Sequence, residues 1–341
     1  MDQNQFKKLK GLLKTKKNIV IIPHKGPDGD AVGSTTALYG YLKQLDHEVS
    51  LITPNDFPTF LKWMKYADQF INYENNQEVA DQLIQEADII FNLDHNDFSR
   101  TGAMEEILQQ QSKTFVMIDH HQQPGDFAEF TYSDTSMSST CEMIYHFIKM
   151  MDATESIDKD MATAMYTGIL TDTGSFKYRS TTSTTLRVAA ELIDKGADSE
   201  MINRRIYDVN TPSRMKLLGV ALNNLKIFPE YRAAYITLSQ EELDDNNFKK
   251  GDTEGFVNYA LSLDDIVLAQ IFIENKEDQI IKTSLRSKGD FNVNLLAREH
   301  WQGGGHNNAA GGKSDENMEA AVSKFISILP AYEKELLATQ I

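Results

Sequence analysis

Three short polar segments carry side chains that can hold a divalent cation, and each comes directly after a short, mostly apolar run. They are His24-x3-Asp28-x-Asp30, Asp94-His95 and Asp119-His120-His121. Imidazole nitrogens and carboxylate oxygens are ligands that manganese, zinc and magnesium ions accept in proteins. In the first segment, Gly26, Pro27 and Gly29 allow the backbone to turn so that its side chains can converge.

The apolar runs before these segments are typical of strands buried on both faces, and they cover residues 19–22, 89–93 and 115–118. In an open parallel sheet, ligands bind beyond the carboxyl ends of the strands. Three runs that end in carboxylate and imidazole therefore predict one shared crevice. The first segment alone is equally compatible with a polar turn between a strand and a helix that Asp30 caps, because short motifs give false positives. The repetition favours the shared site.

The first half of the chain alternates apolar runs with amphipathic segments, which predicts an α/β fold with a parallel sheet and helices on both faces. Further strands are expected at 48–52, 70–73 and 127–132, and helices at 6–16, 31–45, 57–64, 77–86, 104–110, 138–151 and 161–170. Consecutive helices at 184–195, 199–208 and 213–225 follow, with a domain boundary near 210–212. The second domain is expected to have strands at 231–238, 266–273 and 280–285, and helices at 254–263, 292–301 and 316–334.

Several polar positions in the first half have both a structural and a functional interpretation. Residues 138–140, Ser-Ser-Thr, are helix caps in the first interpretation, whereas in the second the exposed amides of that helix hold a phosphate. Asp172 follows the helix expected at 161–170, and it is a cap unless it faces the predicted crevice. The single cysteine, Cys141, is expected to be a buried helical residue rather than a nucleophile.

A glycine-rich segment at 303–312 is the second candidate site. Five glycines in ten residues cannot pack a core, so we expect a loop whose amides approach a ligand closely. His306 within it and Arg286 at the end of a predicted strand would both donate to a phosphate or carboxylate. A flexible linker is the alternative interpretation of the same glycines.

Composition limits the classes of partner. The chain has 341 residues, which favours two domains, and a formal net charge of −16, which disfavours binding to long duplex nucleic acid. An acidic surface is also compatible with simple solubility. One cysteine excludes an intrachain disulfide framework, and no apolar run approaches the ~18–20 residues that cross a bilayer. The lysine-rich first 17 residues lack a signal-peptide core, so a cytoplasmic protein without membrane partners is expected.

Taken together, these motifs resemble the DHH phosphoesterase family with its DHH-associated C-terminal domain. Asp119-His120-His121 matches the motif that names the family, and the first, second and fourth motifs match at His24-x3-Asp28-x-Asp30, Asp94 and Asp172. The resemblance covers nearly the whole chain in order, and the segment 303–312 looks like the family's glycine-histidine signature. Length and domain content are most similar to the bacterial nanoRNases, which also dephosphorylate 3′-phosphoadenosine 5′-phosphate (pAp). RecJ-type exonucleases carry additional modules, and family II pyrophosphatases lack the glycine-histidine segment.

The resemblance implies a centre of two divalent cations. Mn²⁺ is the expected ion, and Mg²⁺ and Co²⁺ are the alternatives. One ion would be held by His24 and Asp28, the other by Asp30, His120 and Asp172, and Asp94 would bridge both. His121 would donate to the scissile phosphate or to the leaving oxygen, and Asp119 would orient a histidine. Arg100 either contacts a substrate phosphate or is an ordinary surface arginine. His95 follows Asp94 directly and is given no role.

The implied fold has a Rossmann-like catalytic domain at 1–190, a helical linker at 191–212 and a smaller α/β substrate-binding domain at 213–341. The implied reaction is hydrolysis of very short oligoribonucleotides, of pAp, or of both. In the second domain, Gly304, Gly305, His306 and Arg286 would bind the substrate. Rival functions are a phosphodiesterase for cyclic dinucleotides or linear pNpN, a RecJ-type exonuclease and a non-catalytic nucleotide-binding subunit. Short RNA or a nucleoside bisphosphate is the expected partner, and a homodimer is expected from base rates alone.

Overall fold

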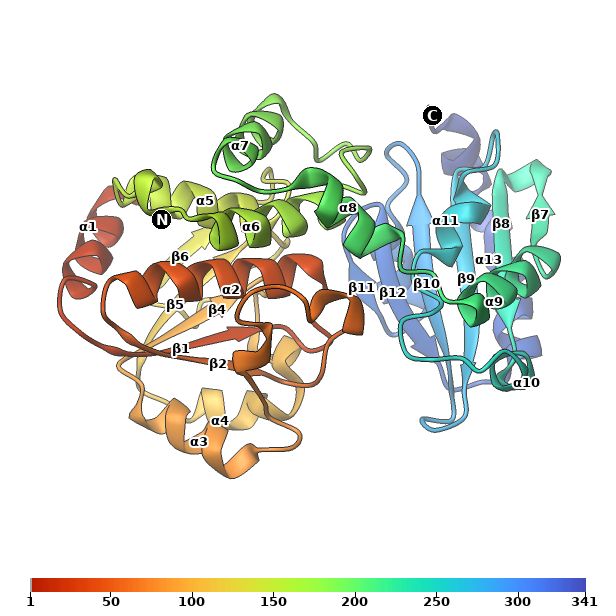
Figure 1. Ribbon diagram of the computed structural model, residues 1–341. Coiled ribbons are helices and arrows are strands. Elements are labelled where there is room, and N and C mark those ends of the chain that lie inside the picture. The colour runs from red at the N-terminus through yellow and green to blue at the C-terminus, as the bar shows by residue number, and fades with distance from the viewer. Residues whose placement is uncertain (1) are drawn as a thin grey trace. The chain divides into compact units, whose positions relative to one another are not determined.

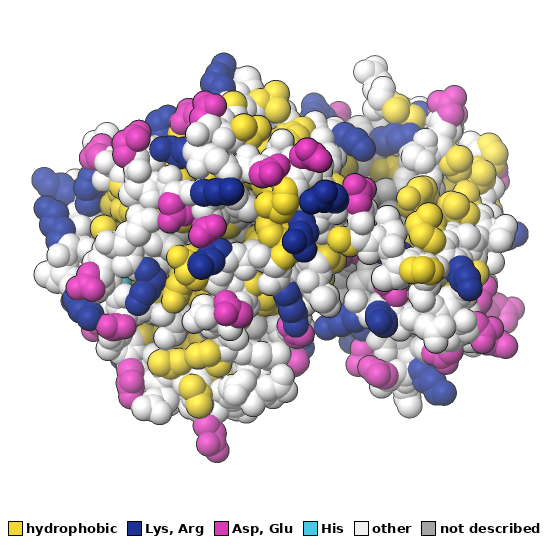
Figure 2. Space-filling view, in the orientation of Figure 1, with side chains coloured by type: hydrophobic (Ala, Val, Ile, Leu, Met, Phe, Trp, Pro, Cys, Tyr) yellow, Lys and Arg dark blue, Asp and Glu magenta, His cyan; other side chains and the backbone are white. Residues whose placement is uncertain are grey.

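The computed structural model describes residues 2–341 and separates into two compact units, Met1–Val209 and Asn210–Ile341. Each unit is built on a sheet of six strands with helices on both faces (Figure 1). Within residues 2–341, no helix combines the length and the apolar character needed to span a bilayer. On the face drawn in Figure 2, acidic and basic side chains are interspersed rather than collected in one place.

The first unit contains the predicted parallel sheet, with strand order β3-β2-β1-β4-β5-β6 and every neighbouring pair parallel. Its strands are β1 (Asn18–Pro23), β2 (Glu48–Thr53), β3 (Phe70–Asn72), β4 (Ile89–Leu93), β5 (Thr114–Asp119) and β6 (Phe130–Ser133). Chain order reverses between β1 and β4, which is the position where ligands bind in sheets of this kind. The α/β fold class predicted from the sequence is therefore confirmed.

Helices cover both faces of this sheet. They are α1 (Gln3–Leu12), α2 (Gly29–Gln44), α3 (Gln77–Glu86), α4 (Glu105–Gln109), α5 (Thr140–Met150), α6 (Lys159–Asp172), α7 (Ser183–Asp194) and α8 (Ser199–Tyr207). Ile19 and Ile21 of β1 belong to the core on the side of α2, α5 and α6, whereas Val20 and Ile22 belong to the core beneath α3 and α4. This alternation explains why the strands read as continuous apolar runs.

The prediction of a helix at 57–64 in this unit is wrong. Only Thr59–Leu61 is helical, as a single 3₁₀ turn that begins after Pro58 in an extended conformation. Phe57, Leu61 and Met64 are nevertheless buried. The spacing of these apolar residues therefore reflects their packing against the core and does not indicate a regular helix.

The second unit has a mixed sheet, with strand order β11-β12-β10-β9-β8-β7. Only the pair β8 and β9 is parallel among its neighbouring strands. The strands are β7 (Lys226–Phe228), β8 (Ala233–Leu238), β9 (Leu268–Asn275), β10 (Ile280–Ser287), β11 (Gly304–Gly305) and β12 (Ala309–Ser314). The helices are α9 (Pro212–Asn223), α10 (Gln240–Asp245), α11 (Phe256–Leu261), α12 (Val293–His300) and α13 (Met318–Ala338). Separate apolar cores fill its two faces.

The glycine-rich segment at 303–312 is not the loop predicted from the sequence. It forms β11, a turn and β12, and β12 pairs with β10 along six residues. A Cβ atom at Gly303 would overlap the carbonyl of Gly311, and one at Gly312 would lie 2.5 Å from the carbonyl oxygen of Trp301. Close backbone packing therefore explains these two glycines without a ligand.

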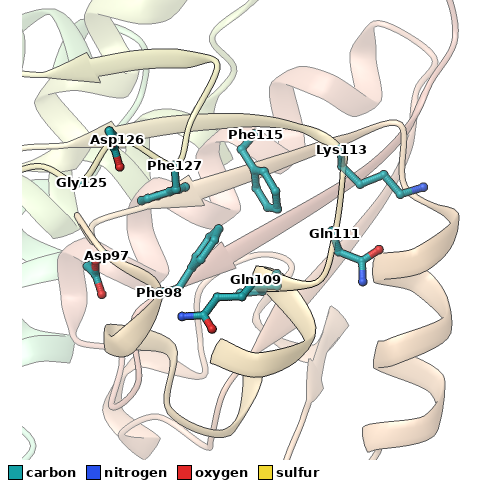
Figure 3. Close-up of a pocket in the computed structure, with 10 residues that line it drawn as sticks. Asp97, Phe98, Gln109, Gln111, Lys113, Phe115, Gly125, Asp126 and Phe127 are labelled. Atoms are coloured by element: carbon teal, nitrogen blue, oxygen red, sulfur yellow. The ribbon is translucent and has the colours of Figure 1, made fainter.

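A cavity of about 410 Å³ lies in the first unit beside α4 and the start of β5 (Figure 3). The rings of Phe98, Phe115 and Phe127 pack against one another in its wall, and Gln109 and Gln111 border it. None of the predicted site residues lines this cavity.

Candidate metal centre

The predicted ligands of the first unit lie where three neighbouring strands end. His24 follows β1, Asp94 follows β4 and Asp119 is the last residue of β5, and β4 is paired with both of the other strands. Two helices supply the rest, because Asp28 and Asp30 start α2 and Asp172 ends α6. Parallel strand ends and helix ends thus meet at one edge of the sheet, as the three polar segments predict.

Two groups of side chains in this cluster could each hold one cation. Ligand atoms of His24, Asp28 and Asp94 lie within 4.8 Å of one another, and so do those of Asp30, His120 and Asp172. The resemblance implies the same two sets except that it places Asp94 in both, whereas Asp94 belongs only to the first of these groups. A third group, Asp94, Asp119 and His121, satisfies the same distance, so geometry alone does not assign the ligands.

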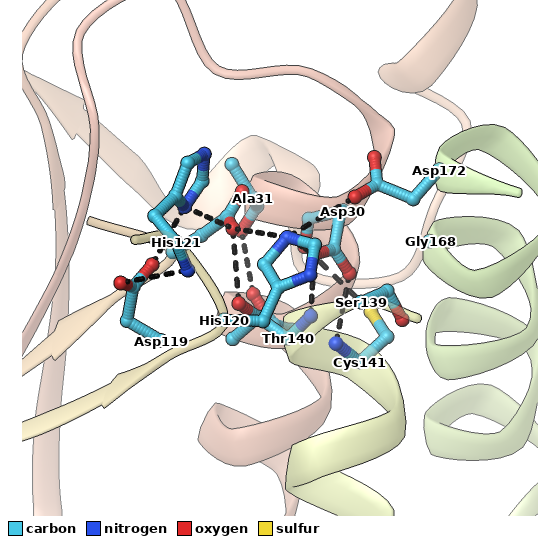
Figure 4. Close-up of polar contacts among 12 residues, drawn as sticks. Asp30, Ala31, Asp119, His120, His121, Ser139, Thr140, Cys141, Gly168 and Asp172 are labelled. Atoms are coloured by element: carbon cyan, nitrogen blue, oxygen red, sulfur yellow. Dashed lines mark hydrogen bonds and ion pairs between the residues drawn. The ribbon is translucent and has the colours of Figure 1, made fainter. Parts of the chain in front are cut away.

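Asp94 stands between the two groups. Its Oδ2 atom lies 3.4 Å from Nε2 of His24, and its Oδ1 atom lies 3.6 Å from Nε2 of His120. His120 Nε2 also lies 3.2 Å from Oδ2 of Asp172 and 3.9 Å from Oδ2 of Asp30 (Figure 4). A carboxylate whose two oxygens face different imidazoles could contact one cation on each side, which is the role that the resemblance implies for Asp94.

Electrostatics in this cluster favour an added cation. Burial raises the pKa of Asp30 well above its usual range, and the carboxylates of Asp94 and Asp172 raise it further. The pKa of Asp172 rises to about 6, mainly because of burial, although a hydrogen bond with His120 opposes the shift. Crowded carboxylates cannot all remain ionised without compensating positive charge.

The histidines supply part of that charge when protonated. Burial lowers the pKa of His24, but the hydrogen bond to Asp94 and the charge of Asp28 outweigh it and raise the value to about 8. For Asp94, burial opposes ionisation, yet the hydrogen bond to His24 and the charges of His121 and His120 hold its pKa well below the usual range. Carboxylate and imidazole donors of this kind suit a hard or borderline divalent cation.

Asp119 and His121 form a separate pair within the cluster. The Nδ1 atom of His121 lies 2.7 Å from Oδ1 of Asp119, and the backbone amide of His121 donates to Oδ2 at 3.0 Å. One oxygen of the completely buried carboxylate therefore orients the imidazole ring, and the other holds the backbone that carries it. A histidine held in this way has one defined ring nitrogen on the side away from the carboxylate.

Both ring nitrogens of His95 contact backbone carbonyls. Its Nδ1 and Nε2 atoms lie 3.2 Å and 3.3 Å from the backbone carbonyl oxygens of Asp97 and Ile22. Burial lowers the pKa of this completely buried side chain to about 4, so it is neutral at physiological pH. The side chain of His95 therefore packs between β1 and the turn that follows β4.

Arg100 lies in the 3₁₀ segment Phe98–Met104, close enough to the cluster for its charge to act on the pKa of His24. Its backbone carbonyl accepts a hydrogen bond from the amide of Lys25 at 2.7 Å. The turn that carries Arg100 is therefore tied to the turn that carries His24.

Two amides at the start of α5 donate to a carboxylate of the candidate centre, so they are not the exposed amides that the phosphate interpretation of residues 138–140 requires. The amides of Thr140 and Cys141 donate to the two carboxylate oxygens of Asp30, at 2.6 Å and 2.8 Å. The hydroxyl of Thr140 also donates to Oδ1 of Asp94 at 2.9 Å. Sequence motifs gave no signal for Thr140 beyond its position at a helix start. Cys141 is completely buried, as predicted, and burial raises the pKa of its thiol.

The predicted substrate-binding residues of the second unit gather on one edge of its sheet. Arg286 of β10 pairs with Ala309 of β12, and His306 lies in the turn between β11 and β12, where its amide donates to the carbonyl of Ala309 at 2.7 Å. Gly304 and Gly305 form β11. The amide of Gly305 donates to the side chain of Asn294 at 3.0 Å, so this amide is already hydrogen-bonded within the protein.

Comparisons with known proteins identify both parts of the chain. Residues 18–169 match the profile of the DHH family, N-terminal domain, and residues 231–331 match that of the DHHA1 domain. This chain belongs to the DHH family. The predicted family is therefore confirmed, and with it the assignment of the chain as a phosphoesterase-type enzyme.

Relatives within the DHH family span most of the chain. The bifunctional oligoribonuclease and PAP phosphatase NrnA of Thermus thermophilus is 29% identical over 94% of this chain and 89% of its own length. The cyclic-di-AMP phosphodiesterase PdeA of Listeria monocytogenes is 27% identical over 96% of this chain but only 49% of its own length. The crystal structure of an exopolyphosphatase-related protein from Bacteroides fragilis is 40% identical, covers 98% of both chains and has a TM-score of 0.94.

Proposed function

We propose that this DHH protein is a metal-dependent phosphohydrolase that removes nucleotides from very short oligoribonucleotides and removes the 3′-phosphate from pAp. The observation that carries the proposal is the placement of Asp94 between two ligand groups, beside the Asp119–His121 pair. The similarity to NrnA over 94% of the chain supports these substrates.

The residues present fit two divalent cations. We propose that His24 and Asp28 hold one, that Asp30, His120 and Asp172 hold the other, and that Asp94 contacts both. Cations bound there supply Lewis acidity, which neutralises charge on phosphoryl oxygens and lowers the pKa of water. Mn²⁺ is the proposed ion because it accepts both imidazole and carboxylate, and Mg²⁺ and Co²⁺ are the ions to compare with it.

The protein's own side chains complete the reaction. His121 donates a hydrogen bond to the scissile phosphate or a proton to the leaving oxygen, and Asp119 keeps its ring in the required orientation. Arg100 adds positive charge for a substrate phosphate. These groups act on the phosphoryl group, whichever nucleotide carries it.

In the second unit, we propose that Arg286 and His306, with the backbone at Gly304, hold the end of the substrate that is not cut. The amide of Gly305 is left out of this set because it already donates to Asn294. A terminal anchor explains a preference for short chains, because a longer chain would have to extend past it. The net charge of −16 acts in the same direction, since it repels long polyanions. The domain bounds at 190 and 212, a cytoplasmic location and a homodimer remain predictions.

A second candidate function is hydrolysis of cyclic dinucleotides or of their linear pNpN products. The specific support is the Listeria relative, a cyclic-di-AMP phosphodiesterase that matches 96% of this chain. The same metal centre would serve this reaction, so the substrate alone separates the two candidates.

The deciding experiment is a turnover assay with Mn²⁺ on pAp, pApA, a 24-mer RNA, a cyclic dinucleotide and pyrophosphate. We expect rapid cleavage of pAp and pApA and little cleavage of the 24-mer. Preference for the cyclic dinucleotide would support the second candidate, and preference for the 24-mer would indicate a RecJ-type exonuclease.

Two variants test the division of labour. Asp94→Ala is expected to abolish turnover of every substrate, because it removes the carboxylate common to both ligand groups. His306→Ala is expected to raise KM for nucleotides far more than it lowers kcat. Turnover retained by Asp94→Ala would contradict the two-cation centre, and tight nucleotide binding without any turnover in the unmodified protein would indicate a binding subunit.

A further inference from the structure

One five-residue segment, Met137–Cys141, contacts three of the six proposed metal ligands. Nδ1 of His120 lies 3.2 Å from the carbonyl oxygen of Met137, so Nε2 is the nitrogen that faces the carboxylates. Two amides of the segment donate to the carboxylate of Asp30 (Figure 4). The Thr140 hydroxyl donates to Asp94. His120, Asp30 and Asp94 come from three different elements, so this segment joins them.

The segment is itself firmly anchored. Oε2 of Glu142 accepts hydrogen bonds from the amide of Ser138 at 3.0 Å, from the hydroxyl of Ser138 at 2.5 Å and from the hydroxyl of Thr185 at 3.0 Å. The Glu142 side chain is almost completely buried, with 1% exposed. A buried carboxylate with three donors fixes the start of α5 relative to α7.

The backbone of Asp94 is unusual for a residue other than glycine. Its φ angle is +61°, in the left-handed region that non-glycine residues rarely adopt. Conformations of this kind persist at functional sites when the surroundings determine them. The hydroxyl of Thr140, 2.9 Å from Oδ1, contacts the oxygen that lies nearer His120.

We propose that Thr140 is a positioning residue for the metal centre. Its hydroxyl fixes the rotation of the Asp94 carboxylate, and its amide fixes Asp30, so that both ligands are oriented before a cation binds. A carboxylate oxygen has lone pairs enough to accept this hydrogen bond and to bind a cation at once. This inference rests on the proposed function, because it assumes that Asp94 and Asp30 are metal ligands.

The test compares Thr140→Val, which removes the hydroxyl and keeps the branched shape, with Thr140→Ser, which keeps the hydroxyl. Thr36→Val is the matched control, since Thr36 is also buried but its hydroxyl bonds only to carbonyls of its own helix, α2. Mn²⁺ binding to each metal-free protein is measured by calorimetry. We expect Thr140→Val to bind Mn²⁺ about 10- to 100-fold more weakly, and Thr140→Ser and Thr36→Val to bind like the unmodified protein.

Several results would overturn the proposal. One is unchanged Mn²⁺ affinity in a folded Thr140→Val variant, and another is equal weakening in Thr140→Val and Thr36→Val. If Thr140→Val does not fold, the Mn²⁺-loaded crystal structure of the unmodified protein decides, and a Thr140 hydroxyl more than 3.5 Å from Asp94 contradicts the proposal. Failure of the unmodified protein to bind Mn²⁺ would instead contradict the proposed function.

Discussion

Asp94 and His95 are neighbours in the chain, yet their side chains have opposite surroundings. Asp94 faces His24 and His120, whereas His95 faces two backbone carbonyls. The left-handed backbone of Asp94 accounts for this difference, because it turns the chain sharply at the end of β4. A residue type that suits a metal site is therefore not enough to assign a ligand.

At this scale we predict that His95→Leu weakens folding without changing the number of cations bound. Loss of the hydrogen bond that the single N–H of the neutral ring donates to the carbonyl of Ile22 or Asp97 is expected to cost about 1–3 kcal/mol of unfolding free energy. Thermal unfolding and Mn²⁺ calorimetry on the same preparation measure the two effects. A variant that binds one fewer Mn²⁺ than the unmodified protein would show that His95 is a ligand.

At the scale of elements, three helices meet directly beneath the metal centre. A Cβ atom at Gly168 of α6 would overlap the sulfur of Cys141 on α5 and lie 2.7 Å from Oδ1 of Asp30 on α2. The contact between α6 and α2 is thus close enough to exclude even a methyl group. The packing of these helices therefore determines where the proposed ligand Asp30 lies.

We predict that Gly168→Ala destabilises the first unit, although alanine normally favours a helix. The added methyl group is expected to cost about 1–3 kcal/mol through overpacking and to weaken Mn²⁺ binding by displacing Asp30. Gly11→Ala in α1 is the control, because no neighbouring atom lies within 4 Å of its added Cβ, and it should gain up to about 1 kcal/mol. Calorimetric unfolding compares the two. Equal stabilisation by both changes would show that α6 can shift without cost.

The elements also show what a sequence can and cannot predict. The ligand segments were predictable because each lies within a few residues of a strand end, and parallel strands share one edge. Thr140 contacts Asp30 across 110 positions of the chain, and no local pattern reports such a contact. The hairpin at 304–314 was missed because its glycines serve backbone packing, which a composition argument cannot distinguish from flexibility.

At the scale of the whole molecule, the two units have separate cores, and the proposed ligands belong only to the first. Buried carboxylates crowd the first unit, where burial above all, and then neighbouring carboxylates, raise the pKa values of Asp30 and Asp172. The second unit has no corresponding group of His, Cys, Asp and Glu ligands drawn from residues 210–341 alone. A cation should therefore act on the stability of one unit and not on the other.

We predict two transitions in calorimetric unfolding, of which Mn²⁺ raises only one. At a free concentration 100 times Kd, one bound ion adds about 2.7 kcal/mol, which corresponds to roughly 5–10 °C for a unit of this size. Excess EDTA should return the transition to its original temperature. An equal rise of both transitions would contradict the assignment of the metal centre to the first unit.

The order of the proposed ligands along the chain has a consequence for synthesis of the protein. His24 comes first and Asp172 last, so about 150 residues separate the two ends of one small site. At ~5–20 residues per second, a ribosome needs roughly 7–30 s to make that interval. Throughout it, the growing chain presents carboxylates and imidazoles without the helix that completes them. Capture of the cation proposed for Asp30, His120 and Asp172 would therefore come late, after all six strands of the first sheet have been made.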